Sequence, residues 1–282
     1  MNNNFIDNFI LNAIAEDLGD GDHTSLSCIP AESKGKAHLL VKESGILAGV
    51  EIAERVFKKI DSGIEIRKIL TDGTNVKYGD ISFIVEGKVL SLLQAERLVL
   101  NIMQRMSGIA TTTRTYVDKL EGLHTKILDT RKTTPGMRLL EKMAVKIGGG
   151  ENHRIGLFDM ILIKDNHIDF AGGIEKAIEK ANEYLRRNKK DLKIEIEARS
   201  LTDVKEIMRV GKINRIMLDN FSVEETVEAI ALISERYETE SSGGITIKNI
   251  RDYALCGVDY ISVGALTHQI QSLDMSLKAI DF

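Results

Sequence analysis

The sequence predicts an α/β protein whose second half is built from βα units around a parallel sheet. The chain has 282 residues, which suits two domains or one large α/β unit. Its content of 43% hydrophobic and 28% charged residues is that of an ordinary globular protein, so it can bury a full core. After Leu120, short apolar runs alternate with helix-like segments, and this alternation is typical of a parallel sheet flanked by helices.

Cysteine usage and charge narrow the class of protein. Cys28 and Cys256 lie far apart and lack metal-ligand spacing, so a reducing, cytoplasmic compartment is expected. The N-terminus has no basic segment followed by an apolar run of signal-peptide length, and no stretch approaches the roughly 18 apolar residues of a membrane span. The formal net charge of −4 favours neither nucleic acid nor a membrane surface as a partner.

The first part of the chain mixes a short N-terminal helix with strands. Strand-like runs are expected at 37–41, 64–70 and 81–85, separated by short polar or glycine-containing turns. From about Leu90 to Leu120 the apolar positions follow a helical period. No low-complexity tract or linker marks a domain boundary, so only this change of rhythm indicates one.

The second part is predicted to contain a series of short strands separated by helices. The strands are expected at 126–128, 160–163, 194–196, 215–218, 237–239 and 260–263. Helices are expected between most of them, for example over 173–187, 201–210 and 223–235. The last four strands recur at a spacing of about 22 residues, which is short but feasible for βα repeats.

Ionisable and glycine-rich segments follow these strands. They are 129–132 (Asp-Thr-Arg-Lys), 164–167 (Lys-Asp-Asn-His), 197–199 (Glu-Ala-Arg), 219–220 (Asp-Asn), 240–244 (Glu-Ser-Ser-Gly-Gly) and 262–265 (Ser-Val-Gly-Ala). In a parallel barrel these strand ends meet on one face, where βα-barrel enzymes place their chemistry. A purely structural barrel needs no such concentration, so the pattern favours an active site on this face.

One segment is unusually basic for an acidic protein. Residues 131–154 contain six Lys or Arg and only two Glu. Arginine can bind a carboxylate through two hydrogen bonds, and lysine acts as a point charge. The candidates for anion binding, which follow a strand or a glycine run, are Arg131, Lys132, His153 and Arg154.

The rest of this segment has a plainer interpretation. The spacing of four between Arg138, Lys142 and Lys146 puts these residues on one side of a helix, and a solvated helix face is favoured for them. The glycine run 148–150 either lets the backbone approach a ligand or forms a simple loop.

The later strand ends are first acidic and then rich in glycine. Glu197 and Asp219 could bind sugar hydroxyls or a Mg²⁺ ion carried by a phosphorylated substrate. The turns that contain Ser242, Gly243 and Gly244, and then Ser262 and Gly264, lie on the last strands, where barrels usually bind phosphate. The face therefore divides into a cationic half and a phosphate-and-metal half, which suits an acidic acceptor and a phosphorylated sugar donor.

Lys164 has two interpretations. A lysine at the end of a barrel strand can form a Schiff base, or it can stabilise negative charge. Charge stabilisation is favoured here, because Lys164 lies among other cationic candidates. Asp165 and His167 either orient their neighbours or satisfy local hydrogen bonds.

Long motifs in a characteristic order run through the chain. The first part contains 16–22 (EDLGDGD), 47–49 (LAG), 95–97 (AER) and 107–111 (SGIAT). The second part contains 129–136 (DTRKTTPG), 148–154 (GGGENHR), 163–167 (IKDNH), 218–221 (LDNF) and 240–246 (ESSGGIT). With these motifs the chain closely resembles the family of quinolinate phosphoribosyltransferase, also called carboxylating nicotinate-nucleotide pyrophosphorylase, over nearly its whole length.

The resemblance implies an N-terminal α/β sandwich domain and a C-terminal incomplete, open βα barrel. We expect these domains at 1–108 and 109–267, with 268–282 packed back on the first domain. The family forms homodimers whose active sites lie at the dimer interface and receive an arginine from the partner subunit, and the matching residue here is Arg97. The pattern of residues alone would leave Arg97 as a surface charge on a helix.

The resemblance also implies roles for the candidate residues. Those that match positions around the quinolinate carboxylates are Arg131, His153, Arg154 and Lys164, with Lys132 beside them. Glu197 and Asp219 match positions near the ribose and Mg²⁺. The phosphate region contains Ser242, Gly243, Gly244, Ser262 and Gly264. The expected catalytic groups are Lys132, Lys164, Glu197 and Asp219.

The implied reaction is transfer of phosphoribosyl from phosphoribosyl pyrophosphate to quinolinate with loss of CO₂, a step of de novo NAD biosynthesis that uses Mg²⁺. The nearest alternatives are a non-carboxylating nicotinate phosphoribosyltransferase and a paralogue linked to molybdate transport. More distant alternatives are a Schiff-base lyase centred on Lys164 and a phosphate-binding module without catalysis.

Overall fold

A computed structural model describes residues 3–280 of the chain. They form two compact units, one with residues 3–114, 133–149 and 266–280 and the other with residues 115–132 and 150–265. The expected domains also include residues 1–2 and 281–282, which lie outside the described part. Between residues 3 and 280, no helix is both long enough and apolar enough to cross a membrane.

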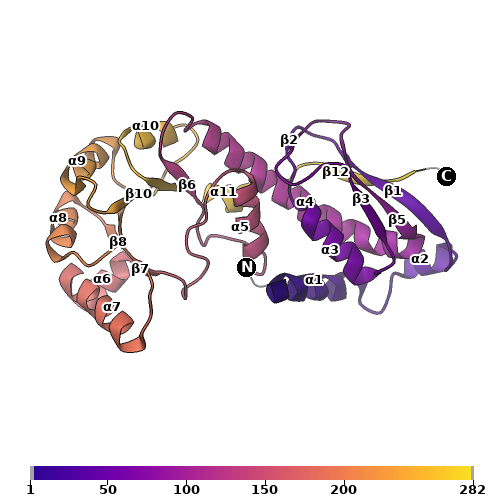
Figure 1. Cartoon of the computed structure of the whole chain (residues 1–282), viewed down its shortest axis with the longest axis horizontal. Helices are drawn as coiled ribbons and strands as arrows, with labels where there is room; N and C mark the ends of the chain where they lie inside the picture. Colours follow the sequence, from indigo (N-terminus) through magenta and orange to yellow (C-terminus); the bar gives the residue numbers. More distant parts are fainter. Residues whose placement is uncertain (1–2, 281–282) are drawn as a thin grey trace. The chain divides into compact units, whose positions relative to one another are not determined.

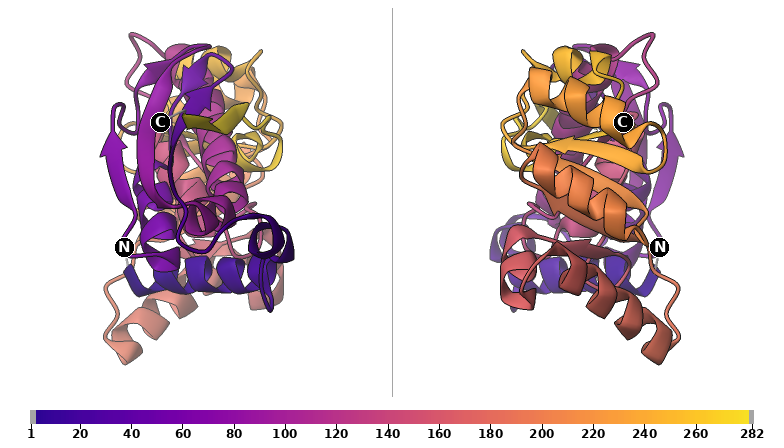
Figure 2. Two further views of the ribbon diagram at one scale, coloured as in Figure 1. Left: turned by 90° about the vertical axis from the view of Figure 1, so that its right-hand side faces the viewer. Right: turned by 90° about the vertical axis from the view of Figure 1, so that its left-hand side faces the viewer.

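The first unit is built on a four-stranded antiparallel sheet in the order β12-β1-β5-β3 (Figure 1; Figure 2, left). Its strands are β1 (Lys34–Val41), β3 (Glu65–Lys68), β5 (Ile81–Lys88) and β12 (Met275–Ile280), with a separate pair β2 (Gly45–Ile46) and β4 (Asn75–Val76). The helices that lie in this unit or enter it are α1 (Asn3–Leu18), α2 (His23–Cys28), α3 (Val50–Ile60), α4 (Val89–Asp118), α5 (Arg138–Ile147) and α11 (Ala265–His268).

An apolar core lies between this sheet and its helices. Strand β1 alternates in burial, and Leu39 and Val41 are on its buried side, as expected for a strand with one face on a core. Phe57 of α3 meets Phe83 of β5 edge to face, with ring centroids 6.0 Å apart. Each such buried side chain stabilises the fold by about 1.5–3 kcal/mol. Strand β12, within the segment expected to pack back on this domain, pairs with β1.

The second unit contains six parallel strands in the order β6-β11-β10-β9-β8-β7. The strands are β6 (Lys126–Leu128), β7 (Ile161–Ile163), β8 (Ile194–Ala198), β9 (Arg215–Asp219), β10 (Glu238–Ser242) and β11 (Tyr260–Ser262). The helices are α6 (Asp165–Ala171), α7 (Ile174–Asn188), α8 (Leu201–Val210), α9 (Val223–Ile233) and α10 (Ile250–Leu255). The described residues form no ladder between β6 and β7, so the barrel is open, and the expected incomplete βα barrel is confirmed.

The two faces of this sheet have different chemistry, because successive side chains of a strand point to opposite faces. Outward-facing Ile196 and Ile216 belong to an apolar cluster with helix residues such as Val204. Helices α6 to α10 lie on this outer side (Figure 1; Figure 2, right). The residues in register on the inner side are largely polar, and they include Glu195, Glu197, Arg215, Asp219, Glu240 and Ser242. The apolar core of this unit therefore lies between the strands and the outer helices. The polar interior of the barrel is where a ligand could bind.

The inner polar residues explain an error in the expected strand boundaries. The strands expected at 194–196 and 237–239 run to Ala198 and Ser242 in the structure. Glu197 and Glu240 therefore lie within strands and not after them. The apolar runs on which the prediction rested stop early because every second residue of these strands faces a polar interior.

A second error concerns helix α5. Lys142 was expected on a solvated helix face, but its side chain is completely buried, as is that of Glu141. Glu141 is bound by Arg105, whose Nε and Nη2 lie 2.8 and 2.6 Å from Oε1. Lys146 is exposed as expected and Arg138 is half-buried, so the expectation is wrong for Lys142 alone. A spacing of four puts residues on one side of a helix but does not tell which of them meet other parts of the protein.

Candidate active site

A cavity of about 430 Å³ lies within the second unit at the carboxyl ends of the parallel strands. Among its lining residues are all the candidates from the sequence except two: Arg131, Lys132, His153, Arg154, Lys164, Glu197, Asp219, Ser242, Gly243, Gly244 and Ser262. Of the two others, Arg97 is exposed on α4 and Gly264 is half-buried after β11. The structure also adds lining residues that the sequence did not single out as candidates: Thr130, Leu162, Met217, Asn220 and Glu240.

Two guanidinium groups dominate the cationic side of the cavity. Burial lowers the pKa of Arg154, and the positive charge of Arg131 lowers it further. The side chain of Arg154 is braced by a bond from Nη1 to the carbonyl of Met160, 3.3 Å long. Because the two like charges oppose one another, an anion bound between them would relieve their repulsion.

Buried Asp129 fixes the segment that carries these groups. Its Oδ1 accepts a hydrogen bond from the backbone N–H of His153 at 2.9 Å, and its Oδ2 accepts one from Asn152 Nδ2 at 2.6 Å. Asp129 is completely buried directly after β6. It therefore ties the segment before Arg154 to the end of that strand.

Lys164 and Glu197 form an ion pair on the inner side of the barrel. The Glu197 side chain is almost fully buried, whereas about half of the Lys164 side chain is exposed. This pairing agrees with Lys164 serving as a charge. His167 accepts a hydrogen bond from the backbone N–H of Lys164, 2.9 Å long, and so caps α6, while the backbone N–H of Asp165 donates to Glu197 at 3.2 Å. Both neighbours thus satisfy local hydrogen bonds.

The acidic side of the cavity pairs Glu197 with Asp219. Burial raises the pKa of Asp219, and the nearby charge of Glu197 raises it further. Two neighbouring carboxylates are the kind of oxygen donors that a divalent cation binds. These two residues could therefore hold a metal ion.

A tight turn closes the cavity after β10. Gly243 has a φ of +93°, and a Cβ at this position would lie 2.2 Å from Asn220 Oδ1. Asn220 itself has a φ of +57° and donates its backbone N–H to the carbonyl of Ser242 at 2.8 Å. Only glycine leaves room for this close approach of two loops.

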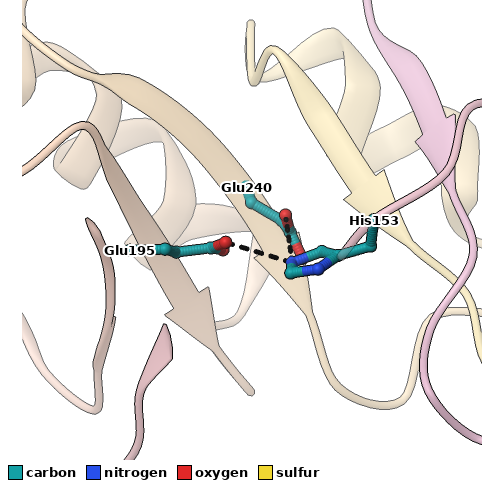
Figure 3. Close-up of side chains that lie close together, drawn as sticks. All are labelled: His153, Glu195 and Glu240. Carbon is teal, nitrogen blue, oxygen red and sulfur yellow. Dashed lines mark ion pairs between the residues drawn. The ribbon is translucent and has the colours of Figure 1, made fainter. Parts of the chain in front are cut away.

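A buried ion cluster, formed by His153, Glu195, Glu240 and Arg215, lies in the barrel interior. His153 Nε2 is 3.0 Å from Glu195 Oε2 and 3.4 Å from Glu240 Oε2 (Figure 3). Arg215 Nη1 lies 2.9 Å from Glu240 Oε2 and 3.9 Å from Glu195 Oε2. Both glutamates are completely buried, so their charges depend on these partners.

The protonation of His153 follows from its contacts. Burial lowers the pKa of His153, but the nearby carboxylates of Glu195 and Glu240 outweigh it and raise the pKa to about 9. The ring Nδ1 accepts the backbone N–H of Arg154 at 2.7 Å. The two observations conflict, because the raised pKa favours an imidazolium whereas this bond needs an Nδ1 without a proton. The short contact with the N–H of Arg154 favours the neutral ring with its proton on Nε2. A second proton can therefore bind only if the Arg154 bond opens.

Sequence reasoning missed Glu195, Glu240 and Arg215 as parts of the interior. A signal was present, because the segment 194–197 reads Ile-Glu-Ile-Glu. Strands of a parallel sheet with helices outside are usually apolar on both faces. Charged residues at every second position of such a strand indicate a polar barrel interior.

Comparison with known proteins agrees with this architecture. Residues 22–107 match the family model of the quinolinate phosphoribosyl transferase N-terminal domain, and residues 109–278 match that of the C-terminal domain. The chain belongs to the quinolinate phosphoribosyltransferase family. One relative in this family, quinolinate phosphoribosyltransferase [decarboxylating] 1b of Nicotiana tabacum, is 45% identical over 94% of this chain and 80% of its own length.

Bacterial members of the quinolinate phosphoribosyltransferase family are also similar. The probable nicotinate-nucleotide pyrophosphorylase [carboxylating] of Bacillus subtilis is 41% identical over 93% of this chain and 89% of its own length. The crystal structure of NadC from Streptococcus pyogenes superimposes with a TM-score of 0.93 at 38% identity and covers 100% of this chain and 99% of that one.

Proposed function

We propose that this chain transfers the phosphoribosyl group of phosphoribosyl pyrophosphate to quinolinate, releasing pyrophosphate and CO₂ and forming nicotinate mononucleotide for de novo NAD biosynthesis. One observation carries the proposal. A single cavity holds paired guanidinium groups on one side and paired carboxylates with a glycine turn on the other. Relatives that are 41–45% identical bear the name of this enzyme.

The cationic side suits the acceptor. Quinolinate carries two carboxylates, and Arg131 and Arg154 are two guanidinium groups that repel one another without an anion. Arginine binds a carboxylate through two parallel hydrogen bonds, which also fixes the orientation of the ring. The acceptor would therefore bind with its carboxylates on this side and its ring nitrogen toward the donor.

The chemistry then needs positioning and charge, and no protein nucleophile. The lone pair of the pyridine nitrogen forms a bond to the anomeric carbon of the ribose while the bond to pyrophosphate breaks, and its electrons leave with pyrophosphate. Lys132 and Lys164 can stabilise the negative charge that develops. The nitrogen, now positive, accepts electron density as the adjacent carboxylate leaves as CO₂, and the ring carbon takes up one proton.

The acidic side suits a ribose and a magnesium ion. Glu197 and Asp219 offer oxygen ligands of the kind that Mg²⁺ prefers, and a divalent cation would offset the unfavourable effect of Glu197 on the Asp219 carboxylate. When bound, Mg²⁺ would neutralise charge on the pyrophosphate. Without it, the two carboxylates can still accept hydrogen bonds from the ribose hydroxyls.

The phosphate end of the donor would lie against the turn that contains Gly243 and Gly244. We expect Gly243→Ala to raise the KM for phosphoribosyl pyrophosphate by about tenfold, since the new Cβ would collide with Asn220. Gly244→Ala is the matched control. A Cβ there meets nothing within 4 Å although φ is +63°, so it adds backbone strain without a collision. If steady-state kinetics show that Gly244→Ala raises the KM for phosphoribosyl pyrophosphate more than Gly243→Ala does, the placement of the phosphate against this turn is contradicted.

The functional unit that we propose is a homodimer. Arg97 is exposed on α4, and it would reach the cavity of the partner subunit.

We place the reaction in the cytosol. Cys28 and Cys256 are free thiols, as expected in a reducing compartment, although plant relatives include proteins named as mitochondrial and chloroplastic.

The second candidate function uses nicotinate as the acceptor and releases no CO₂. Human nicotinic acid phosphoribosyltransferase has a related fold, with a TM-score of 0.66 at 12% identity. That likeness concerns the fold alone. The two guanidinium groups favour an acceptor with two carboxylates, because each of them can bind one carboxylate through two hydrogen bonds.

Parallel assays separate these functions. Purified protein with phosphoribosyl pyrophosphate and Mg²⁺ should convert quinolinate into nicotinate mononucleotide, followed by mass and absorbance. We expect kcat/KM for quinolinate to exceed that for nicotinate by at least about 100-fold, since the site is built for a second carboxylate. Product from nicotinate alone would move the function to the non-carboxylating reaction. Product from neither would point to another acceptor.

A further inference from the structure

The buried ion cluster raises a question that the proposed reaction does not answer. Glu195 and Arg215 do not line the cavity, so they are not expected to touch a substrate. Burying two carboxylates and a guanidinium is costly, and apolar side chains in such places often give equal or greater stability. The cluster is therefore expected to serve something besides folding.

The contacts of His153 indicate what the cluster serves. Its Nε2 faces Glu195 and Glu240 at 3.0 and 3.4 Å, and its Nδ1 accepts the backbone N–H of Arg154 at 2.7 Å. The backbone N–H of His153 is held by Asp129. Only 6% of the His153 side chain is exposed. Both ring nitrogens are thus engaged by the protein, and the ring links the barrel interior to the backbone of Arg154.

Arg215 is the fourth member of the buried ion cluster and holds its glutamates in place. It binds Glu240 at 2.9 Å and Glu238 at 3.0 Å, and its guanidinium lies over the ring of Tyr260, 4.0 Å from the centroid. These contacts come from strands β10 and β11, on which the phosphate turns also lie. These contacts hold the Arg215 guanidinium from three sides, and through its bond to Glu240 it keeps that carboxylate aimed at His153.

On this basis we propose that Glu195, Glu240 and Arg215 are positioning residues for the acceptor. Through His153 they fix the backbone at Arg154, and its guanidinium is thereby aimed at a carboxylate of the pyridine dicarboxylate. This inference rests on the proposed function. It assigns to His153 a role in holding Arg154 in place, with its ring nitrogens turned to the protein.

The same three side chains also satisfy the spacing of a metal site. One ligand atom each from His153, Glu195 and Glu240 lie within 4.8 Å of one another. The guanidinium of Arg215 already supplies positive charge at 2.9 Å from Glu240 and 3.9 Å from Glu195. A divalent cation would have to enter against this charge, so we assign the cluster to ion pairing.

The test compares Glu195→Gln and Glu195→Leu with the wild type. Glutamine keeps the shape and a hydrogen-bond acceptor, whereas leucine removes both. We expect the KM for quinolinate to rise about tenfold in Glu195→Gln and further in Glu195→Leu, while the KM for phosphoribosyl pyrophosphate stays within about twofold. Glu228→Gln, on the exposed side of α9, is the matched control and should behave as the wild type.

A second readout does not depend on turnover. In ¹⁵N-histidine-labelled protein, the His153 signal, assigned by its loss in His153→Gln, should show a proton on Nε2. In Glu195→Gln its second proton should bind at lower pH, because one of the two facing carboxylates is gone while Glu240, Arg215 and Asp129 remain. An inactive wild type would contradict the proposed function instead. An unchanged titration, an equal rise of both KM values, or a stoichiometric metal ion in the purified protein would overturn the positioning role.

Discussion

Replacing Arg131 with alanine should lower kcat/KM for quinolinate by about 10³-fold. The guanidinium would bind one carboxylate of a dianion in a partly buried cavity, and removing one partner of such a pair costs about 3–5 kcal/mol. In the free protein the charge of Arg131 disfavours that of Arg154. Thermal unfolding of the variant is therefore measured beside the kinetics.

This combination separates loss of binding from loss of folding. Steady-state kinetics would be measured beside unfolding curves for Arg131→Ala and for Lys205→Ala, a change of an exposed cation on α8. The control should retain full activity. A variant that loses both stability and activity would show that Arg131 is a structural residue. A variant that keeps its affinity for quinolinate would place the acceptor elsewhere.

Removal of magnesium should abolish turnover, and Asp219→Asn should reproduce most of this loss. The amide keeps the shape of the side chain but withdraws the negative charge that, with Glu197, suits a divalent cation. We expect kcat/KM for phosphoribosyl pyrophosphate to fall by about 10²-fold. Because burial and Glu197 both disfavour the Asp219 carboxylate, Asp219→Asn should be at least as stable as the wild type.

The test removes Mg²⁺ with a chelator, returns it in steps, and measures the reaction rate at each Mg²⁺ concentration. In Asp219→Asn the Mg²⁺ concentration at half-maximal rate should rise, while the KM for quinolinate changes little. Asp203→Asn is a poor control because Asp203 accepts the backbone N–H of Arg199. Asp191→Asn, in the exposed segment before β8, is a better one. Full activity of wild type in chelator would exclude a role for the metal.

The positions of many helices and strands in the second unit could be predicted, because they depend on residues close together in the sequence. The helix expected at 201–210 is α8 itself, begun by Ser200, whose Oγ accepts the backbone N–H of Asp203 at 3.2 Å. Strand β6 lies where it was expected, at 126–128. In both places an apolar period and a clear boundary residue occur within a few positions of one another.

The sequence predicts the candidate residues at or just beyond the carboxyl ends of the strands, such as Glu197 and Asp219, but not those deeper in the strands. The sequence puts Glu240 beyond the end of a strand. The alternation in 194–197 indicates a polar interior at Glu195, but the role of this carboxylate depends on its partners across the barrel. Those partners, His153 and Arg215, are distant in sequence. Arg97 shows the other limit, because nothing in the pattern of an exposed helix distinguishes it from an ordinary surface charge.

The separation between the outer and inner faces of the barrel strands has a consequence for how such an enzyme can change. The outward isoleucines bury apolar surface against the helices and so supply folding energy, whereas the lining residues outside the buried ion cluster are largely polar and face the cavity. Substitutions in the lining can therefore alter which acceptor is taken while the scaffold stays folded. Stability and specificity are adjustable independently here, so laboratory evolution of new acceptors should begin from the inward positions.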